Sequence, residues 1–258
     1  MGKIIVFANQ KGGVGKTTSA VNVAACVGAK GRRVLLVDLD PQGNSTSGVG
    51  INKKNMRFSS YDVIIGHIPA ENAIIKTEYE NLSIMPSNIQ LAGAEFELVT
   101  DDNRVYKLRD ALATVVDNYD YIFIDCPPSL GILTVNCLTA SDSVIIPMQC
   151  EFYSLEGLSQ LVQSIKTTKR LYNKKLNLLG ILITMYNGRL NLSIQVMDEL
   201  KKYYASKLFN TTVVRNVRLS EAPSYGMPII YYDKYSKGAE AYNAVADELL
   251  KRTEGCFT

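Results

Sequence analysis

One glycine-rich loop, set between a predicted strand and a predicted helix, constrains the fold of this chain more than any other feature. The strand is expected at Lys3–Ala8, the loop reads NQKGGVGKTT over residues 9–18, and the helix is expected at Thr17–Lys30. Glycine residues let successive backbone N–H groups converge on phosphate oxygens in front of a helix N-terminus. The unit therefore predicts a phosphate site at the carboxyl end of a buried strand.

The sequence of this loop differs from the common phosphate-loop pattern GxxxxGK[ST]. Gln10 stands where that pattern has its first glycine, and an additional lysine, Lys11, follows it. The pattern assigns Lys16 to the β- and γ-phosphates of a nucleotide and the Thr17 hydroxyl to a magnesium ion. The residues expected to surround the phosphates are Gly12, Gly13, Val14, Gly15, Lys16, Thr17 and Thr18.

Short apolar runs alternate with helical patterns along the rest of the chain. Strands buried on both faces and separated by helices are typical of a parallel sheet wound by right-handed crossovers. We therefore expect one α/β domain over residues 1–258, a P-loop NTPase with a mostly parallel central sheet flanked by helices on both faces. Further strands are predicted at Val34–Val37, Leu82–Met85, Tyr121–Ile124, Ser143–Pro147 and Leu178–Thr184, and further helices at Gln90–Leu98, Arg104–Asp117, Leu155–Leu171, Ile194–Lys207 and Gly238–Arg252.

The composition favours a globular cytoplasmic protein. Hydrophobic residues make up 47% and charged residues 21%, and the apolar runs are far shorter than the roughly 20 residues of a membrane span. The chain enters its first strand without a signal-peptide pattern, so we expect residence in the cytoplasm. The five cysteines have no CxxC spacing and His67 is the single histidine, which argues against a zinc site and for reduced, packed thiols.

Carboxylates follow two of the predicted strands. Asp38 and Asp40 come directly after Val34–Val37, and Asp125 comes directly after Tyr121–Ile124. An aspartate at the end of an apolar strand is the Walker B arrangement, in which the carboxylate holds Mg²⁺ through water. Asp38 and Asp40 are spaced to point toward the same metal–phosphate site, although both could instead be turn formers before Pro41.

Together these motifs resemble the deviant Walker A loop and its partners in the ParA/MinD family of ATPases. The resemblance extends over nearly the whole chain and is closest to the short ParA/Soj type. The segments that carry it are KGGVGKT (residues 11–17), VDLDPQGNSTSG (37–48), NIQLAGAEFEL (88–98), DCPPSLGILTVNCLTASDSVIIPMQCEFYSLEGL (125–158) and RNVRLSEAPSYGMPI (215–229).

The resemblance implies the remaining site residues and a magnesium–ATP cofactor. Lys11 would cross a dimer interface to the nucleotide of the partner subunit, and no intramolecular need for Lys11 is evident in the sequence. Asp40 would position the attacking water, and Asp38 would support Lys16 or the Mg²⁺ shell. Adenine would be bound by Asn187 and Asn216, with Val214 covering the ring where the family commonly has proline; alternatively, both asparagines are turn residues.

The resemblance further implies an ATP-dependent homodimer that binds double-stranded DNA nonspecifically, on the nucleoid, and a centromere-binding ParB-like partner whose basic N-terminal peptide stimulates hydrolysis. Residues 151–258 carry 15 basic and 10 acidic residues, whereas residues 1–150 carry 13 and 15. A basic half fits binding to a polyanion, but scattered solvated lysines explain it nearly as well. The expected DNA contacts are Arg189, Arg215 and Arg218.

Three other functions share this loop. A MinD-like membrane-associated ATPase needs a basic amphipathic C-terminal helix, and the tail Leu249–Thr258 with its Glu254 and Gly255 is a poor membrane anchor. A nitrogenase-like iron protein needs two cluster cysteines in glycine-rich loops, which Cys126 and Cys150 do not provide. A metabolic kinase or amide-forming synthetase needs an acceptor pocket that the sequence does not reveal. We therefore expect chromosome or plasmid partitioning.

Overall fold

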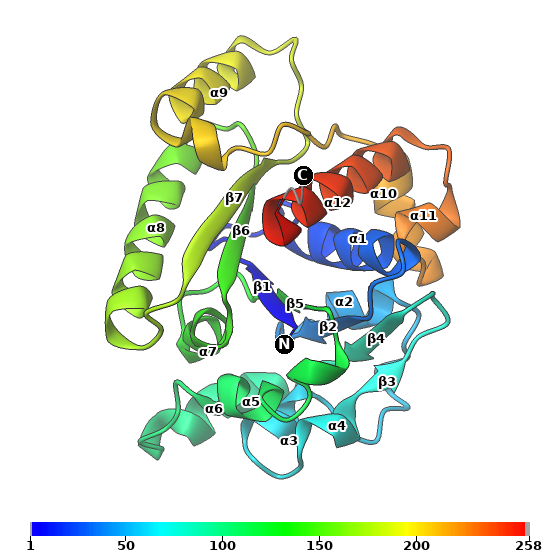
Figure 1. The fold of residues 1–258 in the computed structure, drawn as a ribbon, viewed down its shortest axis with the longest axis vertical. Helices are drawn as coiled ribbons and strands as arrows, with labels where there is room; N and C mark the ends of the chain where they lie inside the picture. The colour runs from blue at the N-terminus through cyan, green and yellow to red at the C-terminus, as the bar shows by residue number, and fades with distance from the viewer. Residues whose placement is uncertain (1, 256–258) are drawn as a thin grey trace.

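Seven strands form a single sheet in the order β3-β4-β2-β5-β1-β6-β7 (Figure 1). All neighbouring pairs are parallel except β3–β4, the antiparallel pair at one edge. This computed structural model describes residues 2–255, so that Cys256 and the last residues of the C-terminal tail lie outside it. The strands are β1 Lys3–Phe7, β2 Val34–Asp38, β3 Ile75–Lys76, β4 Leu82–Met85, β5 Tyr121–Asp125, β6 Ser143–Met148 and β7 Asn177–Ile183.

Helices cover both faces of the sheet because the strands alternate their side chains between two apolar layers. Ile5 and Phe7 of β1 face the layer that contains the first and last helices, whereas Ile4 and Val6 face the other layer. The α-helices of the described residues are α1 Lys16–Ala29, α2 Asn44–Gly48, α3 Ser60–Ile64, α4 Ala70–Ala73, α5 Leu91–Glu97, α6 Lys107–Leu112, α7 Ile132–Ala140, α8 Ser154–Leu171, α9 Asn191–Tyr204, α10 Val217–Glu221, α11 Ile229–Tyr232 and α12 Lys237–Glu254.

The predicted α/β class and the six predicted strands are confirmed, but one predicted helix is wrong in extent. The helix expected at Arg104–Asp117 is helical only over Lys107–Leu112, followed by a 3₁₀ turn at Val116–Asn118. Asn136 on α7 explains the late start, because its amide accepts the N–H of Leu108 at 3.1 Å and donates to the carbonyl of Arg104 at 2.7 Å. The short elements α2, α3, α4, α7, α10, α11 and β3 were not predicted from the sequence.

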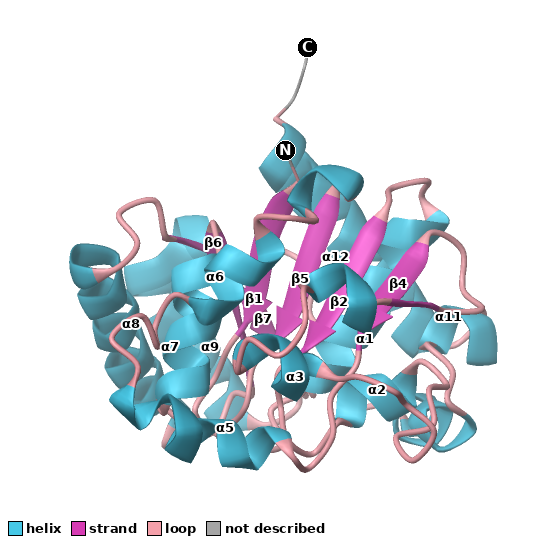
Figure 2. Ribbon diagram, turned by 90° about the horizontal axis from the view of Figure 1, so that it is seen from below, coloured by secondary structure: helices cyan, strands magenta, loops and turns pink. Residues whose placement is uncertain are grey.

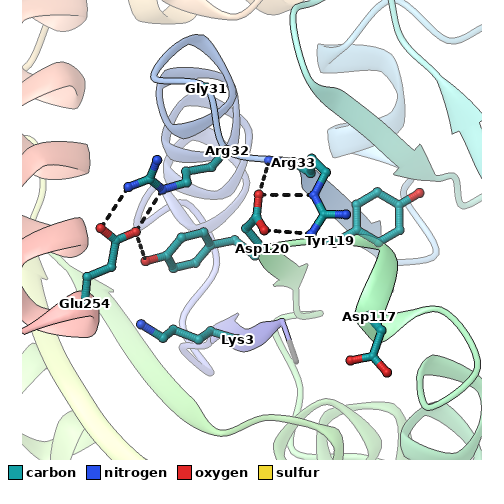
Figure 3. Close-up of a pocket in the computed structure, with 9 residues that line it drawn as sticks. Lys3, Gly31, Arg32, Arg33, Asp117, Tyr119, Asp120 and Glu254 are labelled. Carbon is teal, nitrogen blue, oxygen red and sulfur yellow. Dashed lines mark hydrogen bonds and ion pairs between the residues drawn. The ribbon is translucent and has the colours of Figure 1, made fainter.

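Ion pairs at the amino ends of the strands fasten α12 to the sheet (Figure 3). Arg32, just before β2, forms two hydrogen bonds to the Glu254 carboxylate at 2.9 and 3.0 Å. The Tyr121 hydroxyl donates to Glu254 at 3.1 Å, and Lys3 donates to the carbonyl of Thr253. The hydrogen bond from Arg32 holds the pKa of Glu254 below its usual range. The carboxyl ends of the strands therefore remain free of this helix end.

Two glycine-to-alanine substitutions should have opposite effects on the free energy of unfolding. A methyl group at Gly28 in α1 would lie 2.5 Å from the carbonyl oxygen of Glu80, so Gly28→Ala should destabilise the protein by about 1–3 kcal/mol. A methyl group at Gly93 in α5 would meet only the Glu97 carboxylate at 3.5 Å, so Gly93→Ala should stabilise by about 0.5–1 kcal/mol. Urea unfolding measures both, and equal effects would contradict the packing at Gly28.

Candidate nucleotide site

Three neighbouring strands end at the same edge of the sheet and bring the predicted motifs together. In the register of the sheet, Phe7 of β1 and Asp38 of β2 both pair with Asp125 of β5. The phosphate loop after β1 therefore lies beside the two strand-end carboxylates, at the edge to which the arrowheads point in Figure 2. This is the crevice where open parallel sheets bind ligands.

The phosphate loop is held by side chains from the two strands on its other side. The Thr184 hydroxyl donates to the carbonyl of Val14 at 2.8 Å, and the Gln149 amide donates to the carbonyl of Gly13 at 2.8 Å. Gly15 has φ 82°, a left-handed conformation that favours glycine, and α1 begins directly after it. The loop is thus fixed with its helix N-terminus facing the crevice, as phosphate binding requires.

Lys16 lies buried beneath this loop. Its ammonium donates to the carbonyl of Lys11 at 3.0 Å. Burial lowers the pKa of Lys16, while the charges of Asp125, Cys126 and Asp40 oppose that shift. A desolvated ammonium this close to the loop N–H groups is available to neutralise phosphate charge.

Asp125, a candidate magnesium residue, has a buried carboxylate oxygen that lacks a hydrogen-bond partner of good geometry among the described residues. Its Oδ2 accepts the Ser45 hydroxyl at 2.8 Å, whereas its fully buried Oδ1 has no hydrogen-bond partner of good geometry among the described residues. Burial raises the pKa of Asp125 to about 6, although the Thr17 and Ser45 hydroxyls lower it. A buried carboxylate oxygen without a partner fits a position in the hydration shell of a cation.

Asp38 and Asp40 have different environments. The Asp38 carboxylate accepts the N–H and the hydroxyl of Thr46 at 2.8 and 2.7 Å, together with the N–H of Asp40 at 3.2 Å. Burial, then the charge of Asp125, raises the pKa of Asp38 to about 7. Among the described residues, the carboxylate of Asp40 accepts only one hydrogen bond, from the N–H of Gln42 to Oδ1 at 2.9 Å. Asp38 thus holds the turn that carries Asp40, and Asp40 keeps an oxygen for a ligand.

The additional lysine has an intramolecular partner that sequence reasoning missed. The Lys11 ammonium forms an ion pair with Glu151, in the middle of the segment between β6 and α8. Both side chains remain about half exposed, at 42% and 50%. No intramolecular role for Lys11 was evident in the sequence, and this exposed ion pair is the partner that the structure shows within the subunit.

A cavity of about 530 Å³ beside the phosphate loop is the candidate base pocket. Val214 and Asn216 line it, together with the unpredicted Met185. Met185 has φ 50°, an uncommon and strained conformation for a non-glycine residue. Asn187 is not among the lining residues in the described part of the chain, and its Oδ1 accepts the N–H of Arg189 at 3.1 Å. Asn216 lines the pocket while its Oδ1 caps α10 at the N–H of Arg218.

The three arginines predicted to contact DNA come from two adjacent segments. A bridge between Tyr186 and Val214 places residues 186–190 beside residues 214–218. Arg189 is exposed, whereas Arg218 forms ion pairs with Glu221 at 2.9 Å and Asp233 at 3.5 Å. Arg215 lines the base pocket. None of the helices in residues 2–255 combines the length and the apolar character that a membrane span needs.

The fold and the site define a P-loop ATPase whose phosphate loop carries a second lysine. A family model described as an AAA domain matches residues 2–178. The sporulation initiation inhibitor protein Soj of Bacillus subtilis is 55% identical over 249 residues, covering 96% of this chain and 98% of that protein. The chromosome partitioning protein ParA of Myxococcus xanthus is 51% identical, covering 98% and 89%. The chain belongs to the ParA/Soj family of partitioning ATPases; it is an ATP hydrolase that uses ATP and Mg²⁺.

Solved structures confirm the P-loop fold. A cobyrinic acid a,c-diamide synthase from Mycobacterium smegmatis with bound ADP and magnesium has a TM-score of 0.86 at 37% identity, covering 99% of this chain and 96% of that one. A putative plasmid partition protein from Borrelia burgdorferi bound to AMPPNP has a TM-score of 0.84 at 28% identity, covering 98% and 100%. An amide-forming enzyme thus shares this architecture, but the partitioning relatives reported above are more similar in sequence.

In the metal-free protein, we expect the free energy of unfolding to fall as the pH rises from about 4 to about 7. Asp38 and Asp125 have a pKa of 3.8 when unfolded but about 7 and about 6 when folded. Between these values the folded state binds more protons, so raising the pH favours unfolding. Asp125→Asn should flatten the fall, and Asp198→Asn, which removes an exposed carboxylate, should not. Calorimetry across this interval measures both, and a rise in stability for the wild type would contradict the burial.

Proposed function

We infer that this protein is a nucleotide-switched partitioning ATPase that dimerises with ATP, binds DNA nonspecifically on the nucleoid and acts with a ParB-like protein. The observation that carries the proposal is the position of Lys11, at the rim of the phosphate loop and outside the buried site that Lys16 occupies. Lys16 already supplies one cation to the phosphates. The position of Lys11 at the rim would be explained if its ammonium contacted the nucleotide bound by a partner subunit.

The Lys11–Glu151 ion pair is weak enough to be exchanged. Half-exposed ion pairs contribute about 0–1 kcal/mol, because water and salt screen the charges. A polyphosphate carries several negative charges and would therefore compete well with the single Glu151 carboxylate for the Lys11 ammonium. Hydrolysis would then depend on assembly, since the second cation reaches the phosphates only when two subunits meet.

Within one subunit the site residues would divide the remaining work. Lys16 and the loop N–H groups bind and orient the phosphates, and Thr17 and Asp125 are the residues that would hold the magnesium ion, directly or through water. Bound there, the ion supplies neutralisation of charge on the phosphate oxygens. Asp40 would orient the attacking water with its free carboxylate oxygen. Asp38 would keep Asp40 in place through the Thr46 hydrogen bonds rather than contact the nucleotide.

DNA binding would use the surface formed by residues 186–190 and 214–218. Cations bind DNA mainly by releasing counterions from phosphates, which gives affinity without sequence preference. Arg189 and Arg215 form no ion pair among the described residues, whereas Arg218 must exchange Glu221 and Asp233 for phosphate. The alternative, a MinD-like membrane ATPase, predicts binding to anionic vesicles instead of DNA.

Freeing Lys11 from Glu151 should favour the dimer, and removing Lys11 should stop turnover. Glu151→Gln should lower the ATP concentration for half-maximal dimerisation by about twofold to fivefold, because this fold-change corresponds to the free energy of an exposed ion pair. Lys11→Ala should abolish hydrolysis and spare ATP binding. Glu199→Gln, which breaks an exposed lysine pair on α9, is the control. ATP hydrolysis with and without DNA and the ParB-like partner, alongside sedimentation, measures these effects; normal turnover by Lys11→Ala would contradict the role in trans.

DNA binding should require ATP and weaken steeply with salt. If each subunit neutralises about three phosphates, the log–log salt slope should be near −5 for a dimer and near −3 for a monomer. Arg189→Glu should reduce affinity and keep ATP-dependent dimerisation. Titration of nonspecific duplex DNA with salt, in ATP, in ADP and without nucleotide, measures the slope. Equal affinity in all three states would contradict the switch, and vesicle binding without DNA binding would favour the membrane alternative.

A further inference from the structure

The short helix α5 and the turns on either side of it carry two apolar stripes, and only one of them is buried. Leu91, Ala94 and Leu98 pack into the core. The second stripe consists of Ile89, Ala92, Phe96 and Val99, and we call it the exposed α5 stripe. The side chain of Ile89 is 69% exposed, that of Phe96 82% and that of Val99 63%. A helix that is apolar on both sides is usually covered on both sides, and an exposed apolar stripe of this kind is typical of an interaction surface.

Acidic residues predominate around the exposed α5 stripe, and the first basic residue after them is Arg104. Glu95, Glu97, Asp101 and Asp102 are the charged residues of the segment 88–103. Asp101 pairs with Lys107, but no ion pair among the described residues involves Glu95, Glu97 or Asp102. Such a surface repels DNA, anionic lipid and, because two acidic stripes would face each other, a second copy of itself. It fits a short, basic, amphipathic peptide.

The segment contacts both the turn that carries Asp40 and the loop that follows Asp125. Ser87, directly before the segment, donates its hydroxyl to the carbonyl of Asp40 and its N–H to the Thr46 hydroxyl, each at 2.8 Å. Within α5, the Glu95 carboxylate lies against Gly131, where it leaves no room for a Cβ atom. Gly131 ends the loop that follows Asp125. The segment therefore bridges the Asp40 turn and the Asp125 loop.

We propose that the exposed α5 stripe, with its flanking carboxylates, is the docking surface for a basic amphipathic peptide of the partner that stimulates ATP hydrolysis. The inference rests on the proposed function for the identity of the partner. Binding at the stripe brings the peptide against a segment that touches both the Asp40 turn and the Asp125 loop. The edge that carries α5 is also the edge of the nucleotide site (Figure 2).

Peptide binding can be measured directly and separately from hydrolysis. The probe is a fluorescein-labelled peptide of about 20 N-terminal residues from the ParB-like protein of the same organism, titrated with full-length protein by fluorescence anisotropy. Phe96→Asp should weaken binding about tenfold or more, because it removes an apolar contact and adds a like charge to an acidic surface. Glu97→Lys combined with Asp102→Lys should weaken it about threefold or more. Tyr203→Asp, an equally exposed aromatic on α9 at the far end of the molecule in Figure 1, should leave binding unchanged.

The outcomes separate this surface from the proposed function. Basal hydrolysis and ATP-dependent dimerisation of every variant are measured in parallel, and both should remain at the wild-type level. Peptide binding that is absent in the wild type, or insensitive to Phe96→Asp, overturns the docking surface while the ATPase cycle stands. Loss of dimerisation in Phe96→Asp also overturns it, by assigning the stripe to a second copy. Failure of the wild type to dimerise or bind DNA contradicts the proposed function, whereas the anisotropy result still decides the surface.

Discussion

The structure depends on two carboxylates that are buried side by side at the ends of β2 and β5. Asp38 and Asp125 are paired in the sheet register. Burial penalises the ionised form of both; the charge of Asp125 adds to that cost for Asp38, and the charge of Asp40 adds to it for Asp125. Nearby hydroxyls from Ser45 and Thr46 and the ammonium of Lys16 offset part of that cost. Protonation or a further cation would relieve the remaining cost, so at neutral pH the site favours a positively charged ligand.

The residues around this pair form a framework that carries catalytic groups at fixed positions. Asp38 holds Thr46, and Thr46 accepts the N–H of Ser87, whose hydroxyl in turn holds the Asp40 carbonyl. The phosphate loop is held in the same way by Thr184 and Gln149 from the neighbouring strands. The candidate catalytic side chains are therefore carried by backbone segments that hydrogen bonds from several strands hold in place. Catalysis needs reacting groups at such fixed positions.

The local sequence pattern was sufficient to predict the phosphate loop, the carboxylates at the strand ends and the strands of the sheet, because each is encoded by contiguous residues. Partners distant in sequence escaped prediction: Ser45 meets Asp125 across 80 positions, and Glu151 meets Lys11 across 140. The helix α7 was missed because it is apolar on nearly all sides and has no periodic pattern to reveal it. The base contacts could not be fixed, since Asn187 and Asn216 each make the local turn bond that the same residue type favours without a ligand.

The fastening of α12 by Arg32 and Glu254 has a practical consequence for studying the protein in cells. It holds the last described turn of the chain at the amino ends of the strands, across the full height of the sheet from the phosphate loop (Figures 2 and 3). A fluorescent protein fused after this helix would stand clear of the nucleotide crevice, the arginine segments and α5. A fusion ahead of β1 would begin beside the same ion pairs, where Lys3 already binds the Thr253 carbonyl. Both ends of the described chain therefore meet at this edge, and a reporter attached at either would stand clear of the nucleotide crevice.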